Sequence, residues 1–241
     1  MDRTFEAALL STRNACASGE VRTFTLKRPE DFSFDPGQFV WLGTSERVSL
    51  PMAIASGVRD PFLEFTIRRS PNTEPLFQRE VGATVSLSSP KGTAFPLHAV
   101  RADTPVLLVA GGTGVTPIRS TLRSLPEDRV VQAVVGARSA ADALYLDEFG
   151  QNPSVRLTVE DPSNWDGAVG RVTDHLNPLD PSAIAFVCGP DAMMRAVRDV
   201  LLRAGLSSSS VYLSVQALDR DGNVLGPVLA NDDPVLIETL S

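Results

Sequence analysis

The sequence predicts two domains: an antiparallel β-barrel followed by an α/β domain with a doubly wound parallel sheet. Residues 1–100 contain short apolar stretches separated by turn residues, which is typical of small barrels. From Pro105 onward, apolar strands alternate with helical segments, which favours βαβ units. A glycine loop, Gly111–Gly114, follows the first of those strands directly. We therefore expect domains at 1–100 and 101–214, with a C-terminal hairpin tail at 215–241.

Composition and charge narrow the classes of partner. The chain has 241 residues, of which 43% are hydrophobic and 21% charged, and its formal net charge is -7. The negative charge argues against nucleic acid or an anionic membrane as the main partner. No apolar run is long enough for a membrane span, and the N-terminus lacks the order of a signal peptide. We therefore expect a cytoplasmic protein.

Metal and hydrolase chemistry have little support in the sequence. Cys16 and Cys188 lie far apart, and His98 and His175 are the only histidines. Cysteine metal sites need closer spacing, and a serine hydrolase of the α/β type needs a G-x-S-x-G elbow that the sequence lacks. We therefore expect no metal ligands and no serine hydrolase function.

Turns divide the predicted barrel into short strands. Turn residues lie at Asp35–Gly37, at Ser56-Gly57 and at Ser89–Gly92. A polar segment, Leu97–Thr104, is the expected linker to the second domain. The strands expected in this half are Phe5–Leu10, Val21–Leu26, Gln38–Leu42, Phe62–Arg68 and Thr84–Leu87.

The second half alternates strands and helices. Thr116 is the expected N-cap of its first helix, and Pro117 suits the first turn. The expected strands are Val106–Ala110, Val130–Val135, Val155–Thr158, Ala183–Val187 and Val211–Ser214. The expected helices are Thr116–Leu125, Ala140–Phe149, Arg171–Leu176 and Asp191–Ala204.

Two loops join an apolar strand to a helix, Gly111–Gly114 and Cys188–Asp191. In a doubly wound sheet, ligands bind beyond the carboxyl ends of the strands. A glycine loop at a helix start can hold phosphate, because the backbone can approach the ligand and the helix start carries free N–H groups. The same pattern also fits an ordinary strand–turn–helix connection. Cys188 likewise fits either a small core residue or a functional group.

Several motifs of the second half occur in a fixed order: Gly111–Gly114 with Pro117, Gly136–Arg138 with Tyr145 and Glu148, Trp165 with Gly167, Gly170–Val172, and Cys188–Pro190 with Met193. With these motifs the chain resembles the ferredoxin–NADP reductase-like flavoproteins over more than half its length. The resemblance implies an FAD-binding barrel and an NAD(P)-binding α/β domain, with the flavin between them.

The resemblance also assigns roles to residues. Cys188 would be the catalytic position and would border the nicotinamide with Gly189 and Pro190. Arg138 would reach the adenosine ribose, where an arginine can meet a 2′-phosphate. The acidic pair Glu160-Asp161 would repel such a phosphate and favours NADH over NADPH. The loop expected to cradle the pyrophosphate contains Gly111, Gly112, Thr113 and Gly114.

The flavin motif departs from the family pattern. The family's Arg-x-Tyr-Ser run matches a segment in which Leu50 replaces the pyrophosphate-binding arginine and Met52 replaces the aromatic residue that covers the flavin. Ala53 replaces the hydroxyl residue that would bond flavin N5. The positive charge that would bind the pyrophosphate in place of this arginine could come from Arg47, Arg68 or Arg69, although these arginines also fit a solvated strand face. Backbone N–H groups near Asn72-Thr73 could also bind it. The expected flavin-binding residues are Pro51, Met52, Ala53, Ile54, Ser56, Arg68 and Thr73.

Within the family, the chain most resembles the electron-transfer subunits of dihydroorotate dehydrogenase and the gamma subunits of hydrogenases and sulfhydrogenases. These proteins continue into a cysteine loop that holds a [2Fe–2S] cluster. Here the first three ligand positions fall on Arg220, Leu225 and Val228, none of which can bind iron. We therefore expect no [2Fe–2S] cluster. Gly222 and Gly226-Pro227 predict a plain hairpin, followed by Asp233–Leu236 as a closing strand.

The resemblance leads to two functional hypotheses. The first is an NAD(P)H-dependent flavin oxidoreductase that passes hydride from nicotinamide to FAD, and electrons on to a partner subunit or a small acceptor. The alternative is a non-catalytic nucleotide-binding or regulatory subunit with a degenerate flavin site and no cluster. In both, the expected partners are a nicotinamide nucleotide and a redox partner subunit.

Overall fold

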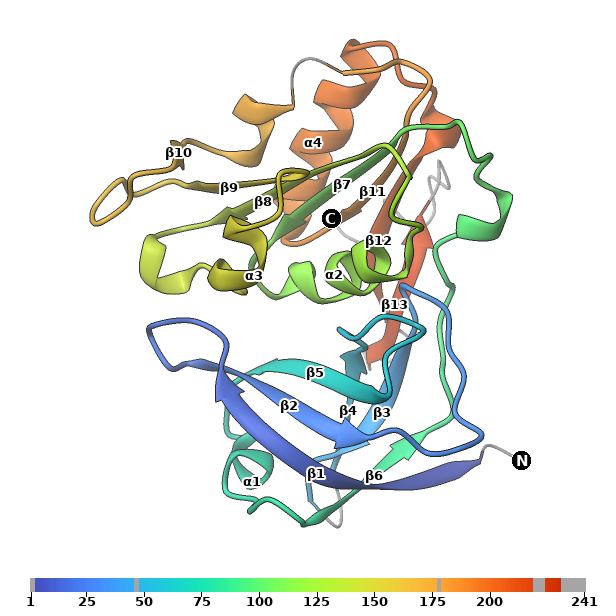
Figure 1. Ribbon diagram of the computed structural model, residues 1–241, viewed down its shortest axis with the longest axis vertical. Helices are drawn as coiled ribbons and strands as arrows, with labels where there is room; N and C mark the ends of the chain where they lie inside the picture. The colour runs from blue at the N-terminus through green and yellow to red at the C-terminus, as the bar shows by residue number, and fades with distance from the viewer. Residues whose placement is uncertain (1–2, 46–47, 177–178, 219–223, 231–241) are drawn as a thin grey trace.

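Two sheets divide the molecule into two halves stacked along its long axis (Figure 1). The computed structural model describes residues 3–45, 48–176, 179–218 and 224–230. The barrel sheet lies in the lower half of the view and the parallel sheet in the upper half. The predicted order of an antiparallel barrel before an α/β domain is confirmed.

The first half is an antiparallel sheet whose alternate side chains form one apolar core. Large residues of this core, such as Phe24, Leu63 and Phe65, are almost fully buried. Its elements are β1 (Thr4–Asn14), β2 (Val21–Lys27), β3 (Phe39–Gly43), β4 (Ser49–Ala53), β5 (Phe62–Arg68), α1 (Glu74–Phe77), β6 (Thr84–Ser88) and the 3-10 turn η1 (Leu97–Ala99). The strands lie in the order β4-β3-β6-β1-β2-β5.

The second half is built around a parallel sheet. Its strands are β7 (Val106–Gly111), β8 (Val131–Ala137), β9 (Val155–Val159), β10 (Ala168–Val169), β11 (Ile184–Cys188), β12 (Val211–Leu218) and β13 (Val224–Ala230). Its helices are α2 (Val115–Ser124), α3 (Leu146–Gly150) and α4 (Asp191–Arg203). Short 3-10 turns are η2 (Gly112–Gly114), η3 (Ala140–Asp142), η4 (Val172–His175) and η5 (Ser208–Ser210).

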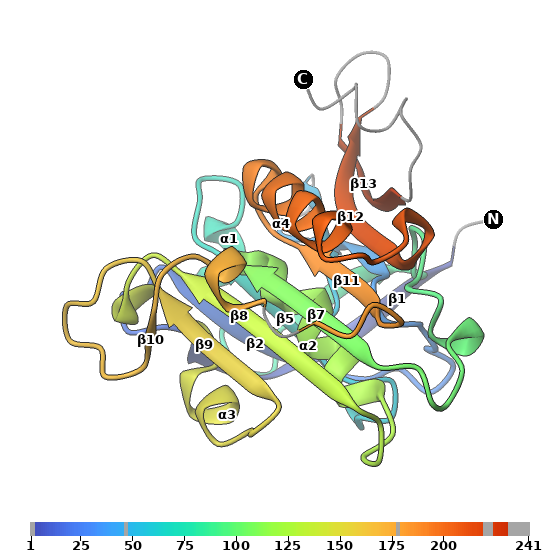
Figure 2. The same ribbon diagram turned by 90° about the horizontal axis from the view of Figure 1, so that it is seen from above.

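Strand β7 lies in the middle of this sheet and is buried along its whole length, as its continuous apolar run predicts. The strands follow the order β10-β9-β8-β7-β11-β12-β13, and β13 alone among them pairs in the antiparallel sense. Helices α2 and α3 lie between this sheet and the barrel, whereas α4 covers the opposite face (Figures 1 and 2). Helix α2 is therefore placed at the junction of the two halves.

Three expected elements differ in the structure. The helix expected at Ala140–Phe149 is broken into η3 and α3, because Tyr145 adopts a left-handed conformation with φ of 56°. The helix expected at Arg171–Leu176 is the 3-10 turn η4. Thr116 is not an N-cap, because α2 begins at Val115 and the Thr116 hydroxyl donates to the Thr113 carbonyl within the first turn.

Strand β4 was not expected from the sequence, since its residues carried the flavin motif and no clear alternation. It is an edge strand of the barrel sheet. Strands β12 and β13 pair in the antiparallel sense as a hairpin, but Gly226 and Pro227 lie within β13, paired with Ala217 and Gln216, and not in the turn where they were expected. Strand β13 also contacts β4, so the hairpin touches both halves (Figure 1). Arg47, Arg220, Gly222 and Asp233–Leu236 lie outside the described residues.

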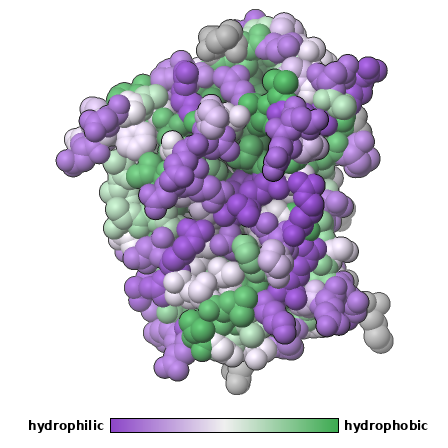
Figure 3. Space-filling model, viewed as in Figure 1, coloured by the Kyte–Doolittle hydropathy of each residue, from purple (hydrophilic) through white to green (hydrophobic). Residues whose placement is uncertain are grey.

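The surface over the junction of the two halves is mainly hydrophilic in the view of Figure 3. Among the described residues, no helix has the length and apolar character needed to cross a membrane.

Candidate functional site

The two predicted loops lie side by side at the carboxyl edge of the parallel sheet. Strands β7 and β11 are neighbours, with Cys188 paired to Ala110. A Cβ built on Gly114 would lie 2.5 Å from the Cys188 carbonyl carbon and 2.6 Å from the Gly189 nitrogen. A Cβ on Gly111 would overlap the Met193 sulfur. Gly114 is therefore required for the close packing of one loop on the other, whereas at Gly111 the flexible Met193 side chain would have to move.

Gly112 has a different environment from Gly111 and Gly114. It is exposed, its φ is +55°, and a Cβ built on it would meet nothing within 4 Å. Its backbone thus borders open space where η2 leads into α2. Free N–H groups at a helix start attract anions, so this loop fits the phosphates of a dinucleotide.

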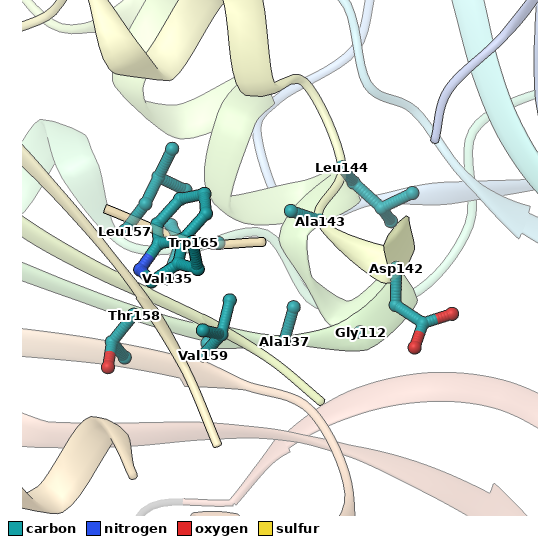
Figure 4. A pocket seen from close by; sticks show the side chains of 11 residues that line it. Gly112, Val135, Ala137, Asp142, Ala143, Leu144, Leu157, Thr158, Val159 and Trp165 are labelled. Carbon is teal, nitrogen blue, oxygen red and sulfur yellow. The ribbon is translucent and has the colours of Figure 1, made fainter. Parts of the chain in front are cut away.

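A small pocket opens beside this loop, between β8, β9 and η3 (Figure 4). Trp165 lies next to Leu157 and Val135 in the close-up. The Trp165 indole donates to the Ala168 carbonyl at 2.8 Å, which fixes the ring orientation. The lining residues are Gly112, Val135, Gly136, Ala137, Asp142, Ala143, Leu144, Leu157, Thr158, Val159 and Trp165. This lining, next to the glycine loop, is largely apolar.

Charged residues surround the ends of β8 and β9. Arg138 is exposed and follows β8. Its carbonyl accepts from the Asp161 N–H at 2.8 Å, which brings the predicted ribose residue next to the acidic pair. Bonds from Ser163 lower the pKa of Asp161, so this carboxylate is charged at neutral pH. Glu160 lies 3.8 Å from Arg171.

Cys188 ends β11 beside Ser214 of the neighbouring strand β12. Burial raises the pKa of its thiol to about 11, and a hydrogen bond with Ser214 opposes the shift. The thiol is therefore neutral at physiological pH and can act there as a packing group or a weak hydrogen-bond donor, but not as a nucleophile.

This state of Cys188 can be tested by alkylation in a Cys16→Ser background. Only thiolates react with iodoacetamide, so we expect the rate to rise about tenfold per pH unit between about pH 7 and pH 10 without reaching a plateau. The urea-unfolded protein serves as the control and should react rapidly. A plateau near pH 9 in the folded protein would contradict the raised pKa.

The predicted flavin residues on β4 lie on two faces of the strand. Met52 pairs with Val40 and packs against the barrel core, while Pro51 and Ala53 lie on the other face, opposite Trp41 and Phe39. All three predicted residues are half-buried. An edge strand with half-exposed apolar side chains fits one face of a ring system, but β4 presents no positive charge.

The remaining predicted flavin residues have other contacts. Ile54 and Ser56 are buried, and the Ser56 carbonyl accepts from Ser120 of α2. The Thr73 hydroxyl donates to the Arg68 carbonyl and accepts from the Ser70 N–H, so its hydrogen bonds are made within its own turn. The Arg68 side chain is exposed at the end of β5 and is free to meet a phosphate.

A buried charge network joins the halves where α2 meets the barrel. Arg119 is 3% exposed and lies 2.6 Å from Glu64 of β5 and 2.7 Å from Glu148 of α3. It also donates to the Ala55 carbonyl at 3.0 Å. Although burial opposes its charge, the two carboxylates raise the pKa of Arg119. This network was not predicted from the sequence, although a charged Glu64 inside the apolar strand Phe62–Arg68 was a visible signal.

Comparison with known proteins decides the family. Residues 108–199 match the oxidoreductase NAD-binding domain. A probable dihydroorotate dehydrogenase B (NAD(+)) electron transfer subunit from Methanopyrus kandleri is 33% identical over 202 residues, which cover 80% of this chain and 73% of that protein. The chain belongs to the ferredoxin–NADP reductase-like flavoprotein family.

A further relative agrees with this assignment, and a solved structure agrees with the fold. The dihydroorotate dehydrogenase B electron transfer subunit from Geobacillus kaustophilus is 34% identical over 146 residues, 60% of this chain. This chain spans only 54% of the length of that relative. The structure of a Neisseria gonorrhoeae ferredoxin NADP+ reductase superposes with a TM-score of 0.71 at 20% identity, covering 93% of this chain and 97% of that one. FAD and NAD(P)H binding fit the family.

Proposed function

We propose that this protein is an NAD(P)H-dependent, FAD-containing oxidoreductase. The observation that carries the proposal is the pairing of the exposed Gly112 loop with the Cys188 loop at one sheet edge. When both groups are bound, the nicotinamide supplies a hydride and the flavin accepts it. We further propose residues 1–100 as the flavin domain, 101–214 as the nucleotide domain and 215–241 as the tail.

The residues of the chain would bind and orient these groups. The η2 backbone would hold the pyrophosphate at the start of α2, and the pocket beside Trp165 would receive the adenosine. Neutral Cys188 would border the nicotinamide with Gly189 and Pro190, filling space without adding charge where hydride leaves. The exposed Arg68 would meet the flavin phosphates, since Leu50 cannot.

We propose NADH as the preferred nucleotide. Asp161 is charged and lies next to Arg138, so a 2′-phosphate at this ribose would meet negative as well as positive charge. We expect NADH to bind about tenfold more tightly than NADPH. Replacing Asp161 with asparagine should narrow this ratio, whereas replacing the distant, exposed Asp103 should leave it unchanged. Equal binding of the two nucleotides by the unaltered chain contradicts the preference.

The tail would carry no [2Fe–2S] cluster. Leu225 and Val228 lie on β13 at two of the ligand positions that the resemblance implies, and neither side chain can ligate iron. Electrons would therefore leave the flavin directly to a partner subunit or a small acceptor. The curated relatives named above are electron transfer subunits, which supports a redox partner.

A second function is favoured by the β4 region. The Thr73 hydroxyl is engaged within its own turn, and β4 lacks the family's arginine. These features fit a nucleotide-binding regulatory subunit with a weakened flavin site.

Acceptor assays separate the two functions. The FAD-reconstituted chain is expected to reduce ferricyanide with NADH as donor, at a rate far above that of free FAD. Tight NADH binding without any such activity would favour the regulatory subunit instead.

A further inference from the structure

The wall of the nucleotide pocket is continuous with a residue held by the barrel. Asp142, Ala143 and Leu144 line the pocket, and Tyr145 follows them in the chain. Tyr145 is 3% exposed, and its φ of 56° is one that L side chains rarely adopt. Such a conformation persists only where surrounding contacts impose it.

Tyr145 makes several contacts with the barrel. Its hydroxyl bonds the Thr66 hydroxyl of β5, and Thr66 in turn bonds Thr23 of β2 at 2.8 Å. Its backbone N–H donates to the Ala15 carbonyl at 3.3 Å, in the loop that follows β1.

Two arginines also lie over the Tyr145 ring. The Arg119 guanidinium lies 4.5 Å from the ring centroid, and Arg13 of the barrel lies 5.6 Å from it. The pocket wall therefore reaches the barrel through the buried Tyr145 side chain, whose hydroxyl meets a threonine pair that is not part of the pocket lining. A backbone bond from the Ser18 N–H to the Ala141 carbonyl, at 3.1 Å, joins the same segment to the barrel.

We propose that Tyr145 is a positioning residue through which the barrel fixes the nucleotide pocket. Thr66 and Thr23 hold Tyr145 in its left-handed conformation, and this keeps the wall at 142–144 in place before the nucleotide arrives. The inference rests on the proposed function, since it concerns the same nucleotide. Without the anchor, ordering the wall consumes part of the binding free energy, so affinity falls.

The test is direct titration of the full-length chain with NADH and with ADP-ribose. Thr66→Val removes the hydroxyl that meets Tyr145 and preserves the shape of the side chain. Thr44→Val is the matched control, because Thr44 is a fully buried barrel residue whose hydroxyl donates to the Val48 carbonyl in the same turn. We expect Thr66→Val to weaken both ligands about tenfold and Thr44→Val to change them less than about twofold.

Two further measurements distinguish a positioning role of Tyr145 from a general loss of folded structure in the variants. Tyr145→Phe should weaken binding at least as much as Thr66→Val, because it removes the hydroxyl that bonds both Thr66 and Thr23. The double variant should weaken binding no further than Tyr145→Phe, because the Thr66 contact is already lost. In turnover the effect should fall on KM rather than on kcat. If Thr66→Val fails to fold, Tyr145→Phe decides the question alone.

The outcomes distinguish this inference from the proposed function. Wild-type affinity in both Tyr145→Phe and Thr66→Val overturns the inference and leaves the proposed function standing. Equal weakening by Thr66→Val and Thr44→Val also overturns it. If the unaltered chain binds neither NADH nor ADP-ribose, the proposed function and the inference both fall.

Discussion

Replacing Arg119 with methionine is expected to lower the free energy of unfolding by about 3–5 kcal/mol. Arg119 lies between the carboxylates of Glu64 and Glu148, and Glu64 is only 5% exposed. Removing the guanidinium leaves the Glu64 charge in the interface with Arg13 as its remaining ionic partner, at 3.4 Å. Urea unfolding followed by circular dichroism measures the change.

An exposed ion pair provides the control for Arg119→Met. Arg101 and Asp103 lie 3.2 Å apart, with side chains 81% and 72% exposed. Because water screens such a pair, Arg101→Met should change stability by less than about 1 kcal/mol. If both substitutions cost the same, the network does not hold the two halves together.

Replacing Gly114 with alanine is expected to weaken NADH binding by about tenfold to a hundredfold. The new Cβ would lie within 2.6 Å of backbone atoms of Cys188 and Gly189, which cannot move as a flexible side chain can. The two loops must separate, and overpacking of this kind costs ~1–3 kcal/mol. Titration with NADH measures the loss.

Gly150→Ala is the control for the loop substitution. Gly150 ends α3, and a Cβ there would meet nothing within 4 Å. This variant should bind NADH like the unaltered chain and should be no less stable. Unchanged affinity in Gly114→Ala would show that contact between the loops does not shape the nucleotide site.

The local hydrophobic pattern of the sequence predicted the architecture, because the first half repeats short strands and the second half alternates strands with helices. Strands such as β5 and β7 are apolar runs bounded by turn residues, and both lie where they were expected. The break at Tyr145 could not be predicted, because the segment around it contains good helix formers. The Tyr145 hydroxyl there bonds Thr66, which is 79 residues away in the chain, so local pattern carries no sign of the contact.

The candidate site was predicted in part. The sequence marked Gly112 and Gly114 as one phosphate loop, but the structure gives them different environments. Gly112 borders open space, whereas Gly114 packs on the Cys188 loop. That division depends on which strands are neighbours, and sequence order alone does not reveal it. The interface network of Arg119 was missed for the same reason, since its partners come from β5 and α3.

Reduction of a bound flavin by NADH tests the central proposal most directly. The purified chain, reconstituted with FAD and freed of excess cofactor, is mixed with one equivalent of NADH without oxygen. We predict that the visible flavin absorbance bleaches in a single turnover, and that it does so more slowly in Gly114→Ala at the same NADH concentration. A chain that retains no FAD, or a bound flavin that NADH leaves oxidised, would contradict the proposal.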